Sequence, residues 1–197
     1  VLERKQLASG TTWHAAGLVG QLRATQNMTN LAKYTAELYA GLEAETGQAT
    51  GFKQNGSISL ATTEERFEEW KRGASMARVF GLEVEVITPA DAQAMYPLLN
   101  LDDVVGAVFL PKDGQVNPLD VTTALAKGAR SGGATILDNI KVMDVLSQNG
   151  HVTGLVTDQG EITCDVVVNA AGMWGREVGA LAGVNVPLHA CEHFYVV

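Results

Sequence analysis

The stretch DVVVNAAG, residues 165–172, is an apolar run that leads directly into MWGREVGALAG, residues 173–183. A strand that is apolar at successive positions is typical of burial on both faces, as in a parallel sheet. The residues that follow predict a helix that ends at a glycine. This pattern predicts a strand, a tight turn and a helix in an α/β protein.

The rest of the chain alternates between predicted helices and strands and contains no repeats. An amphipathic helix is expected where Leu31, Tyr34, Leu38 and Leu42 recur at helical spacing. The predicted helices are 28–46, 63–81 (with Phe67, Trp70 and Met76 facing inward), 89–97 and 117–133, the last with Asn117 as N-cap, Pro118 at its first position and Gly132 past its end. The predicted strands are 56–62, 84–88, 106–111, 134–137, 141–147, 151–158 and 161–171. Because Gly150 and Gly160 mark turns between strands, we expect an α/β architecture with an inserted antiparallel portion.

Composition narrows the class of protein. The 197 residues are 46% hydrophobic and carry 14 Lys and Arg against 22 Asp and Glu, a formal net charge of -8. The basic residues are scattered, so nucleic acid is not an expected partner. No apolar stretch approaches the roughly 18 residues of a membrane span. Two cysteines without Cys-x-x-Cys spacing predict neither disulfides nor a metal site. These features favour a cytoplasmic protein, or one of the mitochondrial matrix if it is eukaryotic.

The chain opens on Val1 and closes on the apolar run HFYVV, which predicts a segment of a longer protein. Near the start, VLE ends in Glu3, and an acidic residue at a strand end of a nucleotide-binding sheet accepts bonds from ribose hydroxyls. A strand that ends in Glu is also common as a solvated strand end. The Gly-rich turn that would precede such a strand is not in this chain.

The stretch SGTTWHAAGL, residues 9–18, combines hydroxyls, glycine and small side chains around a histidine. Closely spaced hydroxyls and a permissive backbone suit phosphate oxygens. Small residues allow a flat ring system to approach the backbone. His14 is either a cofactor-binding residue or a hydrogen-bonded structural histidine.

These residues resemble the D-amino-acid-oxidase superfamily of flavoproteins, in its dimethylglycine and sarcosine dehydrogenase branch. The resemblance rests on VLERKQLASGTTWHAAGL and continues through ETGQATGFKQNGSISLATT, MYPLLN, DGQVNPLDVTTALAKGAR and VVNAAGMWGREVG. It implies a Rossmann-like FAD-binding domain of the glutathione-reductase type with part of an inserted antiparallel substrate domain. Residues 1–50 and 134–185 would be mainly FAD-binding, and 51–116 and 186–197 mainly on the substrate side.

The resemblance also assigns roles to individual residues. Glu3 and Arg4 would lie at the adenosine ribose, and His14 would bond FAD covalently. Val142 would contact adenine through its backbone, and Trp174 would pass under the cofactor, although a Trp at a helix start also suits core packing. The cofactor-binding residues implied by the resemblance are Glu3, Arg4, Gly10, Thr11, Thr12, Trp13, His14, Ala15, Ala16, Gly17, Leu18, Val142, Ala170, Ala171, Gly172 and Trp174.

The activity implied by the resemblance is FAD-dependent oxidation of an N-methylated amino acid, with transfer of a hydride from the N-methyl carbon to flavin. The partners would be a small amine substrate and an electron acceptor, either electron-transfer flavoprotein or oxygen. Tetrahydrofolate would bind in a domain outside this chain. An oxidase that uses oxygen directly and a non-catalytic flavin-binding module are the alternatives.

The last motif is CEHFYVV, which resembles the family's His-x-Tyr-Val-Val strand. Strand alternation predicts His193 and Tyr195 on one face, and the resemblance makes them catalytic residues. His193 would accept the proton of the substrate ammonium or hold its carboxylate. His189 is a rival, and a histidine bonded to a neighbouring carbonyl is the structural alternative.

Overall fold

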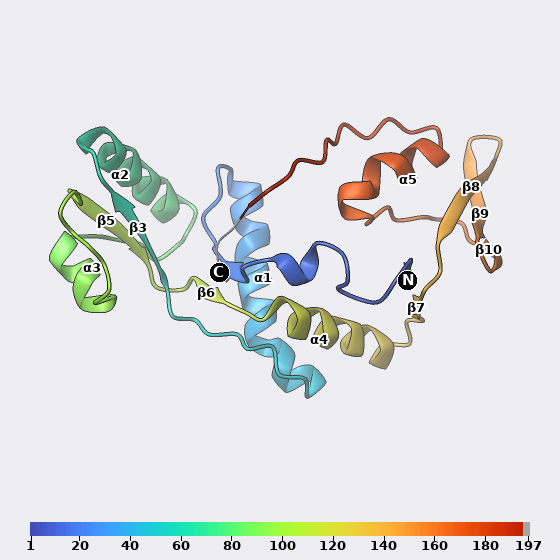
Figure 1. Cartoon of the computed structure of the whole chain (residues 1–197), viewed down its shortest axis with the longest axis horizontal. Coiled ribbons are helices and arrows are strands. Elements are labelled where there is room, and N and C mark those ends of the chain that lie inside the picture. Colours follow the sequence, from blue (N-terminus) through green and yellow to red (C-terminus); the bar gives the residue numbers. More distant parts are fainter. Residues whose placement is uncertain (195–197) are drawn as a thin grey trace. The chain divides into compact units, whose positions relative to one another are not determined.

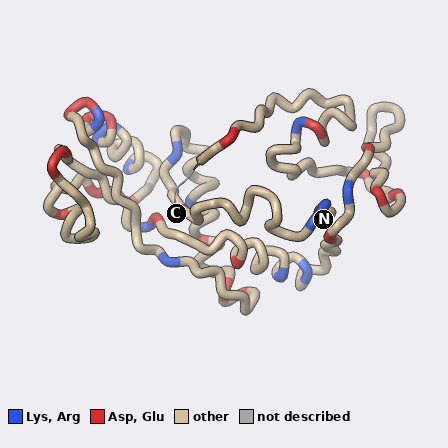
Figure 2. Tube along the Cα trace, in the orientation of Figure 1, with Lys and Arg blue, Asp and Glu red and all other residues tan. Residues whose placement is uncertain are grey.

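The computed structural model describes residues 1–194, and the chain folds as two compact units. One unit joins Val1–Ser9 to Ala134–Val197, and the other is Gly10–Gly133. Tyr195 and the last two valines lie outside the described residues. Figure 2 shows Lys and Arg spread along the traced chain rather than gathered in one segment.

The first unit contains a parallel strand pair, an antiparallel sheet and a short helix. Strands β1 (Leu2–Glu3) and β7 (Leu137–Asp138) pair in parallel. Strands β8 (Val142–Gln148), β9 (His151–Thr157) and β10 (Gly160–Thr163) form an antiparallel sheet in the order β10-β9-β8. The 3-10 turn η2 (Gly172–Trp174) leads into α5 (Gly175–Leu181), which contacts β8.

The predicted buried strand at 161–171 forms only in its first part. Residues 164–171 are not in a strand, and Val166 and Val168 are 75% and 82% exposed. A strand that is buried on both faces needs a neighbour on each side. Within residues 1–194 no strand pairs with residues 165–171, and only Val167 and Ala171 of their apolar residues are half-buried.

The second unit contains the larger core. It begins with the 3-10 turn η1 (Thr12–His14) and strand β2 (Leu18–Val19), which pairs with β6 (Gly114–Gln115). Strands β3 (Ser57–Ala61), β5 (Gly106–Leu110) and β4 (Glu85–Ile87) form an antiparallel sheet with β5 in the centre. The antiparallel portion predicted from the turns at Gly150 and Gly160 is the β10-β9-β8 sheet of the first unit.

Four helices complete the second unit (Figure 1): α1 (Gln26–Thr46), α2 (Glu64–Val79), α3 (Pro89–Met95) and α4 (Pro118–Ser131). Helix α2 contacts β3 and β5, and its Ala74 and Ala77 join the core with Val108 of β5. Trp70 also packs on this core, as predicted, and its Nε1 donates to Leu60 O at 3.2 Å.

Helix α4 begins and ends where the sequence predicts. Asn117 is its N-cap, Pro118 is its first residue and Gly132 is its C-cap. Helix α1 packs against α4, but its buried residues are Thr29, Ala36 and Leu42. The predicted apolar face is therefore buried at Leu42 but not at Leu31 and Tyr34, which are 58% and 61% exposed.

Candidate functional site

The residues predicted to bind the adenosine part of a dinucleotide lie in the first unit. Glu3 ends β1, and its Oε1 accepts from Lys5 N at 2.9 Å, which orients the carboxylate at the strand end. The next residue, Arg4, places its guanidinium carbon 3.8 Å from the ring centroid of Trp174. The structure therefore brings together two predicted site residues that are 170 positions apart in the chain.

The turn that carries Trp174 is stabilised by Asn169. Its Oδ1 accepts from Ala171 N at 3.2 Å, and its Nδ2 donates to Gly175 O at 2.7 Å. Trp174 N donates to Ala171 O at 3.1 Å, which closes the 3-10 turn. Ala170 and Gly172 are exposed in this turn, and Gly172 has a φ of 57°. The small residues predicted to pass close to a cofactor therefore present accessible backbone.

Val142 opens β8 and pairs with Thr157 of β9. A register shift follows it, between Val142 and Asp144. Such a bulge changes the regular alternation of the strand and leaves an extra residue unpaired. Val142 is half-buried, which is compatible with contact through its backbone.

The residues predicted to face the pyrophosphate and the flavin lie in the second unit. Thr12–His14 form η1, in which His14 N donates to Thr11 O at 3.2 Å and Ala15 N to Thr12 O at 3.1 Å. The rings of Trp13 and His14 are 3.7 Å apart between centroids and tilted by 35°. Gly10 is half-buried. Most of the predicted residues that follow it are exposed: Thr11, Thr12, Trp13, His14, Ala15, Ala16 and Leu18.

Gly17 is the buried residue of this segment, with a φ of +76°. Its carbonyl accepts from Val116 N at 2.8 Å, and a Cβ added here would lie 2.1 Å from Val116 O. Glycine is required for this close approach of two backbones. The segment thus has an anchored C-terminal end and an exposed histidine that is followed by two alanines.

His193 is exposed, and residues 191–194 are not in a strand. The predicted strand is therefore absent from its described part, and the alternation expected for His193 and Tyr195 is not formed there. Tyr195 lies outside the described residues. His189, the rival, is also exposed.

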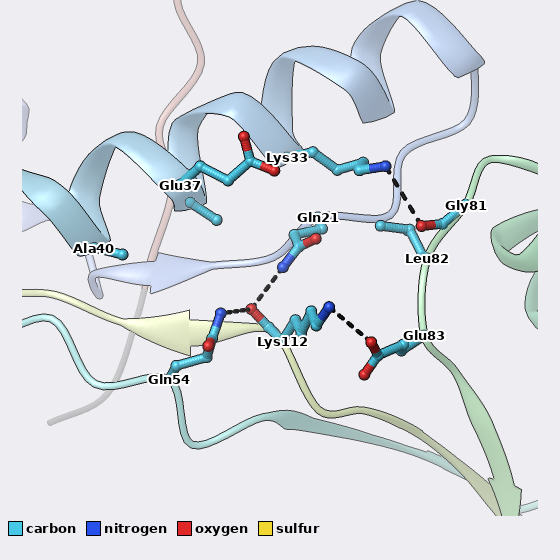
Figure 3. A pocket seen from close by; sticks show the side chains of 10 residues that line it. Gln21, Lys33, Glu37, Ala40, Gln54, Gly81, Leu82, Glu83 and Lys112 are labelled. Atoms are coloured by element: carbon cyan, nitrogen blue, oxygen red, sulfur yellow. Dashed lines mark hydrogen bonds and ion pairs between the residues drawn. The ribbon is translucent and has the colours of Figure 1, made fainter.

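Across residues 1–194, no three His, Cys, Asp or Glu side chains gather as a metal-binding group. None of the helices in that range is long and apolar enough to cross a membrane. A pocket of about 380 Å³ lies in the second unit, between α1 and the loops that precede β4 and β6, and no predicted site residue lines it (Figure 3).

The sequence interpretation missed Asp113, which is 5% exposed and receives two hydrogen bonds. The signal in the sequence was DG at 113–114, which is typical of a turn. A buried carboxylate needs hydrogen-bond donors, and its donors come from distant segments.

The parallel strand pair, the antiparallel sheets and the helices define the class as an α/β protein. The FAD dependent oxidoreductase (DAO) family model matches residues 1–197, and the chain belongs to this family.

The chain is similar over its whole length to several curated proteins. It is 40% identical to human sarcosine dehydrogenase, mitochondrial, and 39% identical to human dimethylglycine dehydrogenase, mitochondrial, covering 22% and 23% of their lengths and 100% of this chain. It is 42% identical to the pyruvate dehydrogenase phosphatase regulatory subunit, mitochondrial, of Mus musculus, of which it covers 23%, again with 100% of this chain. The chain spans about a quarter of the length of these relatives.

Among solved structures, L-proline dehydrogenase from P. horikoshii matches with a TM-score of 0.88 and 31% identity. The match covers 92% of this chain and 48% of that one. This likeness confirms the predicted fold class, a Rossmann-like FAD-binding fold with antiparallel elements.

Proposed function

We propose that this chain is the cofactor-holding part of an enzyme that oxidises an N-methylated amino acid, such as dimethylglycine or sarcosine, with FAD. The observation that carries the proposal is the exposed His14 in a segment of small residues, in a chain of the FAD dependent oxidoreductase family. The similarity to sarcosine and dimethylglycine dehydrogenases supports the substrate class.

FAD, when bound, supplies the acceptor for the hydride that leaves the N-methyl carbon of the amine. In this proposal Glu3 accepts hydrogen bonds from the ribose hydroxyls, and Arg4 is held beside it by the face of Trp174. Val142 contacts adenine through its backbone, while Ala170, Ala171 and Gly172 leave room for the cofactor. Residues 10–18 lie along the pyrophosphate and the flavin.

In this proposal His14 would hold FAD covalently through a ring nitrogen. The new N–C bond would replace a C–H bond of the ring methyl and the N–H bond of the imidazole, and the two electrons released would pass to the flavin and from there to the electron acceptor. The imidazole is exposed and stacked on Trp13, and alanines follow it, so that a methyl group on a flat ring can reach it.

His193 accepts the proton of the substrate ammonium, directly or through water, so that the amine nitrogen presents a free lone pair. The exposed imidazole in the described part of the motif supports this role, and Tyr195 is its proposed companion. Residues 51–116 and 186–197 are assigned mainly to the substrate side, and 1–50 and 134–185 mainly to FAD. Tetrahydrofolate belongs to a domain outside this chain.

The test uses the full-length protein. The protein is mixed anaerobically with dimethylglycine, sarcosine, betaine or glycine. The visible flavin absorbance should bleach with dimethylglycine, with sarcosine or with both, and not with betaine. Acid precipitation should leave a yellow pellet, and His14→Ala should leave it colourless. His151→Ala, at an exposed histidine of β9, is the matched control and should keep the colour. Flavin that acid extracts completely from the unmodified protein contradicts the covalent bond.

The identity of the electron acceptor distinguishes a dehydrogenase from the alternative, an oxidase that uses oxygen directly. Oxygen consumption that equals amine oxidation identifies an oxidase, whereas reduction of electron-transfer flavoprotein without oxygen uptake identifies a dehydrogenase.

A second candidate is a non-catalytic module, and the similarity to a regulatory subunit favours it. In that case the full-length protein binds FAD, but none of the amines reduces the flavin. Exposed His14 then has no covalent partner, and the acid pellet is colourless.

A further inference from the structure

The segment that carries His14 is held by a five-residue stretch, Lys112–Val116, which we call the 112–116 clamp. Gly17 O accepts from Val116 N at 2.8 Å, and β2 pairs with β6 through Leu18 with Gln115 and Val19 with Gly114. The contacts continue at Gln21, whose side chain Nε2 donates to Lys112 O at 2.6 Å. Each position from 17 to 19, and then 21, therefore has a partner in the clamp.

Asp113 is the buried charged residue of the clamp, and its two side-chain oxygens accept hydrogen bonds from two different segments. Oδ1 accepts from Gln21 N at 2.9 Å, and Oδ2 accepts from Ser57 Oγ at 2.6 Å. Ser57 is the first residue of β3. One buried carboxylate therefore connects Gln21, which follows β2, to β3 of the β3-β5-β4 sheet.

The clamp is itself fixed on its other side. Lys53 N donates to Gln115 O and Gln115 N donates to Lys53 O, both at 2.9 Å, and Gly56 N donates to Asp113 O at 2.9 Å. Figure 3 shows the Gln21 and Gln54 side chains both reaching Lys112 O, the second at 3.0 Å. The clamp therefore transmits the rigidity of the sheet to the segment after Gly17.

The chemistry of the site explains why the residue is an aspartate. Gln21 N–H and Ser57 O–H both donate, and a carboxylate accepts both without rearrangement. Hydrogen bonds to an ionised acceptor are stronger than neutral ones, and they offset the cost of burying the charge. An amide at this position accepts one of the two bonds, and the Ser57 hydroxyl can turn to accept the other.

We propose that Asp113 is a positioning residue for His14. Gly17, the first residue that bonds to the clamp, is three residues from His14, and the bonds of η1, from His14 N to Thr11 O and from Ala15 N to Thr12 O, fold the intervening chain into a single turn. Loss of the hydrogen bond from Gln21 N to Asp113 frees the backbone at Gln21 and weakens the pairing of β2 with β6. The His14 imidazole is then no longer held in the position in which it binds FAD. This inference rests on the proposed bond between His14 and FAD.

The experiment compares three variants of the full-length protein. Asp113→Ala deletes both bonds, Asp113→Asn retains both partners, and Ser57→Ala deletes only the bond to β3 and is the matched control. The first readout is amide hydrogen exchange in a peptide that covers residues 15–22. The second is the fraction of FAD that stays with the acid-precipitated protein after a fixed time with added FAD.

Asp113→Ala should raise exchange across 15–22 by about tenfold, the scale of one lost hydrogen bond to a charged group. It should also lower the covalent FAD fraction. Ser57→Ala should lower this fraction less, because the bond from Gln21 N to Asp113 remains, and Asp113→Asn should keep most of it. Equal exchange of this peptide in Asp113→Ala and Ser57→Ala overturns the inference, as does a covalent fraction that Asp113→Ala leaves unchanged.

Two further results are decisive. If unmodified protein holds no covalent FAD, the proposed role of His14 fails, and with it the positioning role, although the exchange data still report whether the clamp exists. If Asp113→Ala yields no folded protein, Asp113→Leu, which deletes both bonds but fills the volume of the side chain, takes its place. Faster exchange and slower FAD incorporation in Asp113→Leu support the inference, and unchanged values in both readouts overturn it.

Discussion

Replacing Gly17 with alanine tests the anchoring of the His14 segment directly. The residue has a φ of +76°, and a non-glycine residue in the left-handed region costs roughly 1–2 kcal/mol. The new Cβ would also lie 2.1 Å from Val116 O, so the two backbones must separate. Overpacking of this kind costs about 1–3 kcal/mol. Gly17→Ala should therefore lower the free energy of unfolding by roughly 2–5 kcal/mol.

Gly133→Ala is the matched control within the same unit. Gly133 has a φ of +89° and no atom within 4 Å of an added Cβ, so that alanine there brings the backbone strain without the overlap. The assay is urea denaturation of flavin-free full-length protein, followed by far-ultraviolet circular dichroism. Gly17→Ala should lose about 1–3 kcal/mol more than Gly133→Ala. Equal losses in the two variants would refute the close approach of Gly17 to Val116.

Three further outcomes are expected. Asn117→Ala removes the oxygen that accepts from first-turn N–H groups of α4 and should lower the free energy of unfolding by about 1 kcal/mol in the same assay, whereas Asn117→Asp should change it little. Hydrogen bonds from the side chain and then the backbone N–H of Thr88 hold the pKa of Asp91 below its usual value. The stability that this contact contributes is therefore present above the ordinary pKa and is lost as the pH falls through the lowered one. An NMR titration should show a higher pKa for Asp91 in Thr88→Val, and an unchanged value contradicts the capping box. Trp174→Leu should weaken FAD binding about 2- to 5-fold by removing the face on which Arg4 stacks, and Trp174→Phe should weaken it less, as measured by flavin fluorescence titration of apo-protein; equal affinity of all three proteins contradicts a role for the stack.

The sequence predicts those features of the fold that depend on neighbours along the chain. The ends of α4 are one example, because Asn117, Pro118 and Gly132 act on N–H and C=O groups within a few residues. The β10-β9-β8 sheet is another, since Gly150 and Gly160 mark the turns between its strands. The apolar run at 165–171 differs, because its conformation depends on neighbouring strands, and in the described residues it has none.

The same distinction separates His14 from Asp113. His14 stands out in the sequence because its neighbours are small and hydroxylated, and these properties are local to ten residues. Asp113 reads as one half of an Asp-Gly turn, and its importance arises from donors 92 and 56 positions away. Candidate site residues in an exposed segment can therefore be recognised from a short sequence motif. The buried residues that hold this segment in place cannot, because pairing between distant strands defines them. The tests of Gly17 and Asp113 address this second kind of residue, and they decide whether the His14 motif functions as a free loop or as a segment fixed to the sheet.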